Sequence, residues 1–490
     1  MRATTHVAII LRHHSSSPSS CTQGEGWGGG SSFDQPRRCP RHAITCIAIC
    51  ASVLAFCFSS PVRAQIPDAP DGNIAGIPVN YTEANVGNYT LPDVLKMFDG
   101  QPVTDAKTWV EKRRPELLKF FETEYYGRVP ATAPKVFWQV VSTDPKALDG
   151  KAIQKVLAGH MGSADGPAIS VTLYTPSNAT GPVPVLTAIS FNFGAVRGGA
   201  ARGPAARGRG ATTGPAGQAG RDAPTTGPAL ARGRGLGGPP RGTPAELISR
   251  GYGYATINYT SIETDNSGRG DANVNIARKL GLAPGQTAPA PDEWGTIASW
   301  AWGISRLMDY YETDPAVDAR RVAITGSSRL GKTVTWAGAN DPRIALVIAC
   351  CGGEGGAALA RRNYGETIAH LVAPSRYPYQ FAGNYAKYAK DPNTSPVDTH
   401  CLVALLAPRP LLLSTASLDG WSDPYGEFLA AKAASPVFEL LGKQGLDGAK
   451  FLIGGPMVGH DLAYINVAGP HTTPNWDAWL KFMDTNLKKS

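Results

Sequence analysis

The sequence predicts an α/β fold with a mostly parallel central sheet and helices on both of its faces. Two observations support this prediction. Short apolar runs rich in β-forming residues alternate with helical patterns along most of the chain, as is typical of parallel strands buried on both faces. The clearest helical patterns are amphipathic and cover residues 297–311 and 476–487, each with its large apolar side chains at helical spacing.

The predicted elements alternate in chain order. The run 169–173 alternates apolar and polar residues, which is typical of a half-buried strand. The expected strands are 169–173, 183–189 (ending near Phe193), 254–259, 321–324, 345–349, 410–416 and 451–453. Further helices are expected at 245–250 and 332–339.

The net charge of +8 over 490 residues does not indicate a nucleic-acid-binding protein, because the charge lies in two segments. Residues 1–64 carry a net charge of +4 and residues 196–242 carry +7, which leaves the remainder at −3. The body that would carry an activity is therefore mildly acidic.

The N-terminal region resembles an export signal. Arg37, Arg38 and Arg41 precede the apolar stretch 43–58, and Val-Arg-Ala at 62–64 offers a cleavage site. We expect residues 1–64 to be the export region and 65–490 to be a periplasmic or extracellular protein without a stable membrane anchor. An apolar anchor that is never cleaved is the alternative.

Residues 196–242 consist mainly of Gly, Ala, Pro and Arg. Such a composition cannot bury enough surface to offset the entropy of its ordering, so we expect a disordered insertion within the catalytic domain. An RGG-like nucleic-acid-binding segment is the alternative, but the insertion contains no aromatic residue. Attraction to an acidic polysaccharide is a further possibility.

A strand, a tight turn and a helix meet at Ser328. The apolar run ends in Gly326, Gly331 follows the serine, and the helical pattern begins at Lys332. This is the arrangement of a nucleophile elbow in an α/β-hydrolase, although its second glycine comes one residue later than in G-x-S-x-G. A structural Gly-Ser turn is the alternative interpretation.

A nucleophilic serine needs a base and an acid that orients the base, and in this fold the order is Ser, Asp or Glu, then His. His460 lies in an expected loop before the last helix and is the predicted base, whereas His400 is expected to be structural. Asp419 follows the strand 410–416 at its carboxyl end and is the predicted acid, with Glu354 as the alternative.

Several motifs in one order resemble the glucuronoyl esterases, carbohydrate esterase family 15. Gly326 to Lys332 resembles their G-C-S-R-x-G-K motif. The other matching segments are Trp294-Gly295, Trp300–Gly303, Gly355–Ala358, Arg361-Arg362, Gly365–Thr367, Ala407–Pro410, Asp419–Pro424 and Gly459–Asp461.

The resemblance implies a serine esterase that cleaves the ester between (4-O-methyl-)glucuronic acid of glucuronoxylan and a lignin alcohol. It implies Ser328 as the nucleophile, His460 as the base and Arg329 in the oxyanion hole. It also implies that Lys332, Glu366 and Trp421 hold the uronate sugar. We expect a monomer that uses no cofactor or metal and has no nucleic-acid partner.

The sequence departs from the fungal members of this family at two positions. Ser327 stands where they have a cysteine, and Cys351 stands where they carry the triad glutamate. Asp419 matches the aspartate that bacterial members often use. An acetyl or other carbohydrate esterase with the same triad remains an alternative, as does a catalytically silent glycan-binding protein.

Overall fold

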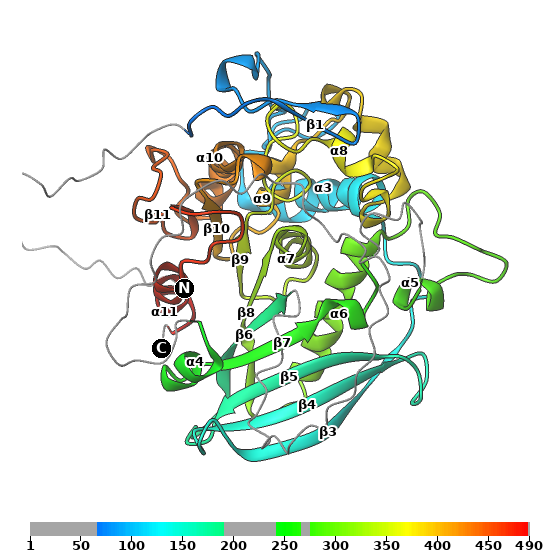
Figure 1. The fold of residues 1–490 in the computed structure, drawn as a ribbon, viewed down its shortest axis with the longest axis vertical. Coiled ribbons are helices and arrows are strands. Elements are labelled where there is room, and N and C mark those ends of the chain that lie inside the picture. Colours follow the sequence, from blue (N-terminus) through cyan, green and yellow to red (C-terminus); the bar gives the residue numbers. More distant parts are fainter. Residues whose placement is uncertain (1–65, 191–241, 266–274, 489–490) are drawn as a thin grey trace, which may run out of the picture. The chain divides into compact units, whose positions relative to one another are not determined.

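The computed structural model describes residues 66–190, 242–265 and 275–488. Within them, ten strands form one large sheet and β1 (Gly72–Ile74) pairs with β2 (Ile77–Val79) in a separate small one (Figure 1). The expected export region 1–64 and the insertion 196–242, apart from Gly242, lie outside the described residues, so these boundaries stay predictions.

The central part of the large sheet is parallel, as predicted. Strands β12, β10, β9, β8, β6 and β7 run parallel in this order, whereas β5, β4 and β3 at one end and β11 at the other are antiparallel. The bounds are β3 Val136–Ala147, β4 Ala152–Met161, β5 Ala168–Pro176, β6 Val183–Ser190, β7 Gly253–Asn258, β8 Val317–Ser327, β9 Leu346–Cys350, β10 Leu411–Ala416, β11 Val458–Gly459 and β12 Leu462–Val467.

Helices cover both faces of the sheet, and each face has its own hydrophobic core. Successive side chains of a strand point to opposite faces, and in β6 Val185 belongs to one core while Leu186 belongs to the other. The first core contains side chains of α6 (Thr296–Tyr311), α7 (Arg329–Asn340) and α10 (Pro424–Leu440). The second contains those of α4 (Pro244–Ser249) and α11 (Trp476–Leu487). This arrangement confirms the predicted α/β fold.

The shorter α-helices are α2 Ala106–Thr108, α3 Arg114–Phe120, α5 Ala277–Leu280, α8 Ile368–Val372 and α9 Thr399–Ala404. In α9, His400 is buried and its Nε2 lies 2.9 Å from the carbonyl oxygen of Pro92. It therefore has the structural environment expected for it.

The expected strand at 451–453 is wrong. That segment contributes only an isolated bridge from Ile453 to Asn466, and the strand at this end of the sheet is β12. Two polar side chains interrupt the apolar pattern of β12, and both donate hydrogen bonds inside the protein. The hydroxyl of Tyr464 donates to the carbonyl oxygen of Pro424 at 2.7 Å, and the amide of Asn466 donates to the hydroxyl of Thr415 at 2.9 Å.

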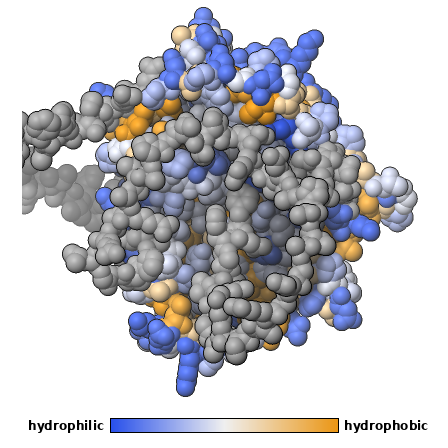
Figure 2. Space-filling view, viewed as in Figure 1, coloured by the Kyte–Doolittle hydropathy of each residue, from blue (hydrophilic) through white to orange (hydrophobic). Residues whose placement is uncertain are grey.

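The coloured atoms in the space-filling view are mostly hydrophilic, with small hydrophobic patches among them (Figure 2). Among the described residues, no helix combines the length and apolar character needed to cross a membrane.

Candidate active site

Ser328 occupies the sharp turn between β8 and α7. Its backbone lies in the left-handed region with φ 60° and ψ −129°, and its N–H donates to the carbonyl oxygen of Cys350 at 2.9 Å. A non-glycine residue held at positive φ is a local strain that is typical of functional turns. The structure thus gives Ser328 the backbone geometry of a nucleophile elbow.

Both glycines of the elbow are needed for close packing. A Cβ atom on Gly326 would lie 2.4 Å from the carbonyl oxygen of Leu330. A Cβ atom on Gly331 would lie 2.6 Å from the carbonyl oxygen of Cys350. The glycine that comes one residue late in the motif therefore lets the first turn of α7 approach the end of β9.

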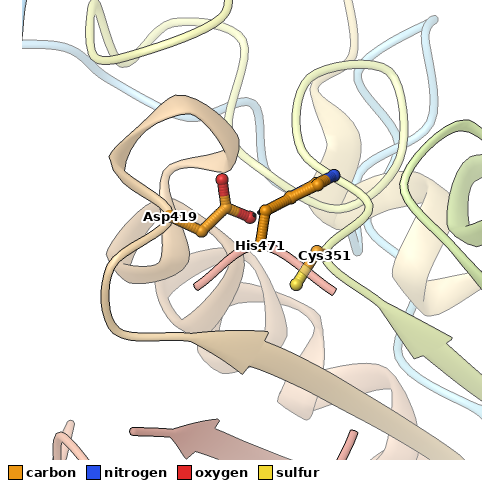
Figure 3. A group of neighbouring side chains, drawn as sticks. All are labelled: Cys351, Asp419 and His471. Carbon is orange, nitrogen blue, oxygen red and sulfur yellow. Dashed lines mark hydrogen bonds and ion pairs between the residues drawn. The ribbon is translucent and has the colours of Figure 1, made fainter. Parts of the chain in front are cut away.

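Asp419 forms its charged contact with His471. Asp419 follows β10 and is 4% exposed, while His471 follows β12 and is exposed. His471 Nδ1 lies 2.6 Å from Asp419 Oδ2 (Figure 3). Because β8, β10 and β12 belong to the parallel part of the sheet, their carboxyl ends bring Ser328, Asp419 and His471 to the same edge.

The environment of His471 changes its proton affinity in two opposing ways. Burial alone would lower the pKa of His471, but the hydrogen bonds to Asp419 and Cys351 and the charge of Asp419 outweigh it and raise the pKa above its usual value. A carboxylate on Nδ1 stabilises the imidazolium that forms when the other nitrogen accepts a proton.

The predicted base, His460, is not part of this arrangement. It lies just before β12, at the amino end of a parallel strand, and its Nδ1 is 3.3 Å from Asp461 Oδ2. The amino ends of the parallel strands form the edge opposite to the one that carries Ser328. The geometry therefore does not bring His460 to the site, and the histidine beside Asp419 is His471. In the sequence, the β-rich run 462–467 and the Gly-Pro turn before His471 are the features that indicate a histidine after the last strand.

The alternative acid, Glu354, has a different partner. Its carboxylate is buried and accepts a hydrogen bond from the hydroxyl of Tyr385 at 2.7 Å and another from the N–H of Gly355 at 3.0 Å. Burial raises the pKa of Glu354 to about 8, which favours a neutral carboxyl group. The geometry therefore supports Asp419 over Glu354 as the acid.

Arg329 begins α7 directly after the serine. Its guanidinium Nη1 lies 2.6 Å from Asp265 Oδ2 and packs over the ring of Tyr377, with 4.8 Å between Cζ and the ring centroid. Asp265 also accepts a hydrogen bond from the hydroxyl of Tyr379 at 2.6 Å. These contacts hold the guanidinium of the residue that follows Ser328 in one position.

Lys332, Glu366 and Trp421 form one connected group, as the predicted sugar-binding set requires. Lys332 Nζ donates to Glu366 Oε2 at 2.8 Å and also to the carbonyl oxygen of Glu354. Trp421 Nε1 donates to Glu366 Oε1 at 3.1 Å. Lys332 and Glu366 are 4% and 8% exposed, so the ion pair is largely shielded from water.

Two further residues at this group were not predicted. The guanidinium of Arg376 packs over the ring of Trp421 at 5.2 Å and lies 4.0 Å from Glu366 Oε1. Tyr81 comes from the N-terminal part of the described chain, and burial together with the charges of Asp419 and Glu366 raises its pKa to about 12. Neither residue belongs to a local motif, so the sequence alone gave no signal for them.

Cys351 is another neighbour of His471. It follows β9 with φ 47° and is 1% exposed. One ligand atom each from Cys351, Asp419 and His471 lies within 4.8 Å of the other two (Figure 3). The position at which the fungal pattern predicts an acid thus does lie beside the histidine, but it carries a thiol.

Comparison with known proteins gives consistent relatives. The family model described as "Glucuronyl esterase, fungi" matches residues 289–442. A carbohydrate esterase, MZ0003, from an unknown prokaryotic organism is 38% identical over 433 residues, covering 85% of this chain and 95% of that protein. The 4-O-methyl-glucuronoyl methylesterase 1 of Wolfiporia cocos is 33% identical over 183 residues, covering 35% of this chain and 45% of that protein.

A solved structure extends the likeness to the whole domain. The glucuronoyl esterase from Solibacter usitatus is 39% identical, with a TM-score of 0.68, and the match covers 83% of this chain and all of that one.

Proposed function

The chain belongs to the glucuronoyl esterases of carbohydrate esterase family 15, which are carboxylic ester hydrolases, and we propose that it acts through Ser328, His471 and Asp419. The substrate we propose is the ester between (4-O-methyl-)glucuronic acid of glucuronoxylan and a lignin alcohol. The observation that carries the triad is the 2.6 Å contact between His471 Nδ1 and Asp419 Oδ2 at the sheet edge that holds Ser328.

The reaction follows from these positions. Ser328 Oγ attacks the uronate carbonyl carbon while His471 Nε2 accepts the hydroxyl proton and Asp419 holds the ring through Nδ1. When the tetrahedral intermediate collapses, the C–O bond to the alcohol breaks and His471 returns its proton to the departing alkoxide. A water molecule then attacks the acyl carbon while His471 accepts its proton. The C–O bond to Ser328 breaks, and His471 returns the proton to Ser328 Oγ.

Arg329 supplies the positive charge for the oxyanion. The guanidinium beside Ser328 and the backbone N–H of Arg329 at the start of α7 are donors for the negative oxygen of both tetrahedral intermediates. The loss of one such donor costs roughly 3–4 kcal/mol in comparable sites. Because Asp265 already holds the guanidinium, its position requires little reorganisation during the reaction.

The group of Lys332, Glu366 and Trp421 supports recognition of the sugar acid. The ammonium and the carboxylate offer a donor and an acceptor for sugar hydroxyls, and the indole offers an apolar surface for a pyranose ring. Because Lys332 and Glu366 are buried, water would weaken little the polar contacts that a sugar makes with them. The proposal for the acid side of the ester rests on this group.

The test compares uronate esters with acetyl esters as substrates. We expect hydrolysis of methyl and benzyl esters of glucuronic acid by the wild-type protein, and its loss in Ser328→Ala. Faster turnover of acetylated sugars than of uronate esters would instead support the acetyl esterase alternative. Retained uronate ester hydrolysis in Ser328→Ala would refute the nucleophile assignment.

Export remains part of the proposal. The charged and apolar pattern of residues 1–64 supports secretion to a compartment where plant polysaccharide is accessible, in keeping with a role in lignocellulose degradation. A mature protein that begins near residue 65, identified by N-terminal sequencing of secreted material, is the expected result.

A further inference from the structure

The thiol of Cys351 gives this site a chemistry that a Ser-His-Asp triad lacks. Cys351, Asp419 and His471 each offer one ligand atom within 4.8 Å of the other two (Figure 3). A thiolate, a carboxylate and an imidazole are the side chains that bind zinc in proteins. Two of the three belong to the proposed catalytic triad, and nothing in the proposed reaction uses the third.

We propose that Cys351, Asp419 and His471 form an inhibitory site for a thiophilic divalent cation such as Zn²⁺. The inhibition rests on the proposed function, whereas the binding itself does not. The cation would take one ligand from each side chain and keep a water molecule in the remaining position.

The distances are close to those of a zinc site. Zinc bonds of about 2.0–2.3 Å to nitrogen, oxygen and sulfur place the ligand atoms of a tetrahedral site about 3–4 Å apart. Because His471 Nδ1 and Asp419 Oδ2 are already 2.6 Å apart, this pair would open by roughly 1 Å on binding, whereas the other separations, at most 4.8 Å, would close by about the same amount. His471 is exposed in the loop after β12 and Asp419 lies in the loop after β10, so neither is locked within a strand.

The backbone directs the thiol toward this space. Cys351 has φ 47°, an uncommon conformation for a non-glycine residue, and its N–H donates to the carbonyl oxygen of Ser414 at 2.9 Å. This bond to β10 holds the residue in register with the strand that precedes Asp419. The thiol thus approaches the histidine from the buried side, while the exposed side of His471 leaves a route for the cation.

The ligand set also determines which cations bind. A thiolate and an imidazole favour Zn²⁺ or Cd²⁺, whereas Mg²⁺ and Ca²⁺ prefer oxygen ligands alone. As the sulfur–metal bond forms, the thiol releases its proton to solvent. No electron transfer is involved, so removal of the cation by a chelator restores the original site.

Binding at this site would stop catalysis through the histidine. If the cation occupies Nδ1, the neutral imidazole carries its proton on Nε2 and cannot accept the proton of Ser328. If it occupies Nε2, the proton acceptor is itself blocked.

The direct test is calorimetric titration of the full chain with ZnCl₂, with Cys351→Ser compared against wild type. We expect the wild-type protein to show a zinc-binding event whose Kd rises at least about tenfold in Cys351→Ser. Even the loss of a residue that only hydrogen-bonds to a metal ligand raises the Kd for the metal by that factor. Cys401→Ser is the matched control, because Cys401 is also buried and its Sγ lies 3.5 Å from a histidine nitrogen. Cys401→Ser should bind zinc with the Kd of the wild type, and titration with MgCl₂ should show no binding at this site.

The second measurement is the zinc concentration that halves uronate ester hydrolysis, with each variant compared to its own metal-free rate. The zinc concentration should rise at least about tenfold in Cys351→Ser, and excess chelator should restore the wild-type rate.

If Cys351→Ser does not fold, His471→Gln takes its place in calorimetry with the same expectation. Equal zinc affinity in the wild type and either variant would overturn the metal site. Absence of ester hydrolysis in metal-free protein would count against the proposed function and leave the calorimetric result valid.

Discussion

At the scale of single residues, the carboxylate of Asp419 contacts one of the two candidate bases, His471, and not the other, His460. It lies 2.6 Å from His471 Nδ1, while His460 has Asp461 as its neighbour before β12. A base is effective only when its ring is oriented toward the nucleophile and its charge is stabilised. The second condition is met for His471, because the carboxylate of Asp419 lies against its Nδ1.

Replacement of the two histidines should therefore have very different effects. We expect His471→Ala to lower kcat by at least about 10³-fold, because Ser328 loses its proton acceptor. His460→Ala should keep kcat within a few-fold of wild type. Steady-state kinetics on a glucuronate methyl ester measures both, and a larger loss in His460→Ala would return the base to that residue.

The two candidate acids can be separated in the same way. Asp419→Asn should lower kcat by about 10²–10⁴-fold, since the amide does not stabilise the imidazolium. Glu354→Gln should change kcat little, because its carboxyl group is bonded to Tyr385 and burial favours its neutral form. The opposite ranking of the two variants would show that Glu354 supplies the charge.

The pH dependence follows from the sign of the shift at His471. Its pKa is raised, so the neutral form that accepts a proton is lost as the pH falls through that raised pKa. In Asp419→Asn the pKa of His471 should fall, and the acid limb of kcat/KM should move to lower pH. An unchanged acid limb would mean that another group controls it.

At the scale of elements, the contact between the first turn of α7 and the end of β9 positions the serine. Gly331→Ala would place a Cβ atom 2.6 Å from the carbonyl oxygen of Cys350, which also accepts the N–H of Ser328. We expect a loss of about 1–3 kcal/mol in the free energy of unfolding together with lower kcat. Chemical denaturation and kinetics provide the two readouts.

Gly181→Ala is the matched control for this prediction. No atom lies within 4 Å of the position that its Cβ would occupy, and Gly181 is exposed. Its stability and kcat should match those of the wild type. Equal effects of the two substitutions would show that the close approach at Gly331 is not important.

The elements also explain which parts of the site the sequence could predict. Ser328 and Asp419 each follow an apolar run that reads as a buried strand, so their places at the carboxyl edge could be inferred locally. The signal for His471 is weaker, because Tyr464 and Asn466 interrupt the apolar pattern of β12 and find their hydrogen-bond acceptors only in α10 and β10. With that strand expected at 451–453, the loop that precedes the last helix is assigned to His460, and His460 is predicted as the base in place of His471.

At the scale of the whole molecule, an ion-pair network joins the N-terminal part of the described chain to the catalytic body. Arg362 is 3% exposed and bonds both to Glu83 and, at 2.8 Å, to Asp423, the residue that caps α10. We expect Glu83→Gln to lower the free energy of unfolding by about 1–2 kcal/mol, because a buried guanidinium loses one of its two charged partners.

The control for Glu83→Gln is Glu111→Gln, which removes the exposed ion pair with Lys107. Both members of that pair are largely exposed, and surface pairs of this kind contribute little to stability. Thermal unfolding of both variants should show a clear decrease only for Glu83→Gln. Similar decreases would mean that burial of Arg362 has no special effect.

The strand order has a consequence for the kinetics of folding. The serine, the acid and the histidine follow β8, β10 and β12, and β12 joins the sheet through β10 on one side and the two-residue β11 on the other. Leu411 of β10 pairs with Leu462 of β12, whereas α6 and α7 are separated in the chain only by β8, and contacts between more distant parts of a chain form later because their loop-closure entropy must first be overcome. Recovery of esterase activity during refolding should therefore lag behind burial of the tryptophans in α6 and α7, and activity reports the docking of this last parallel strand.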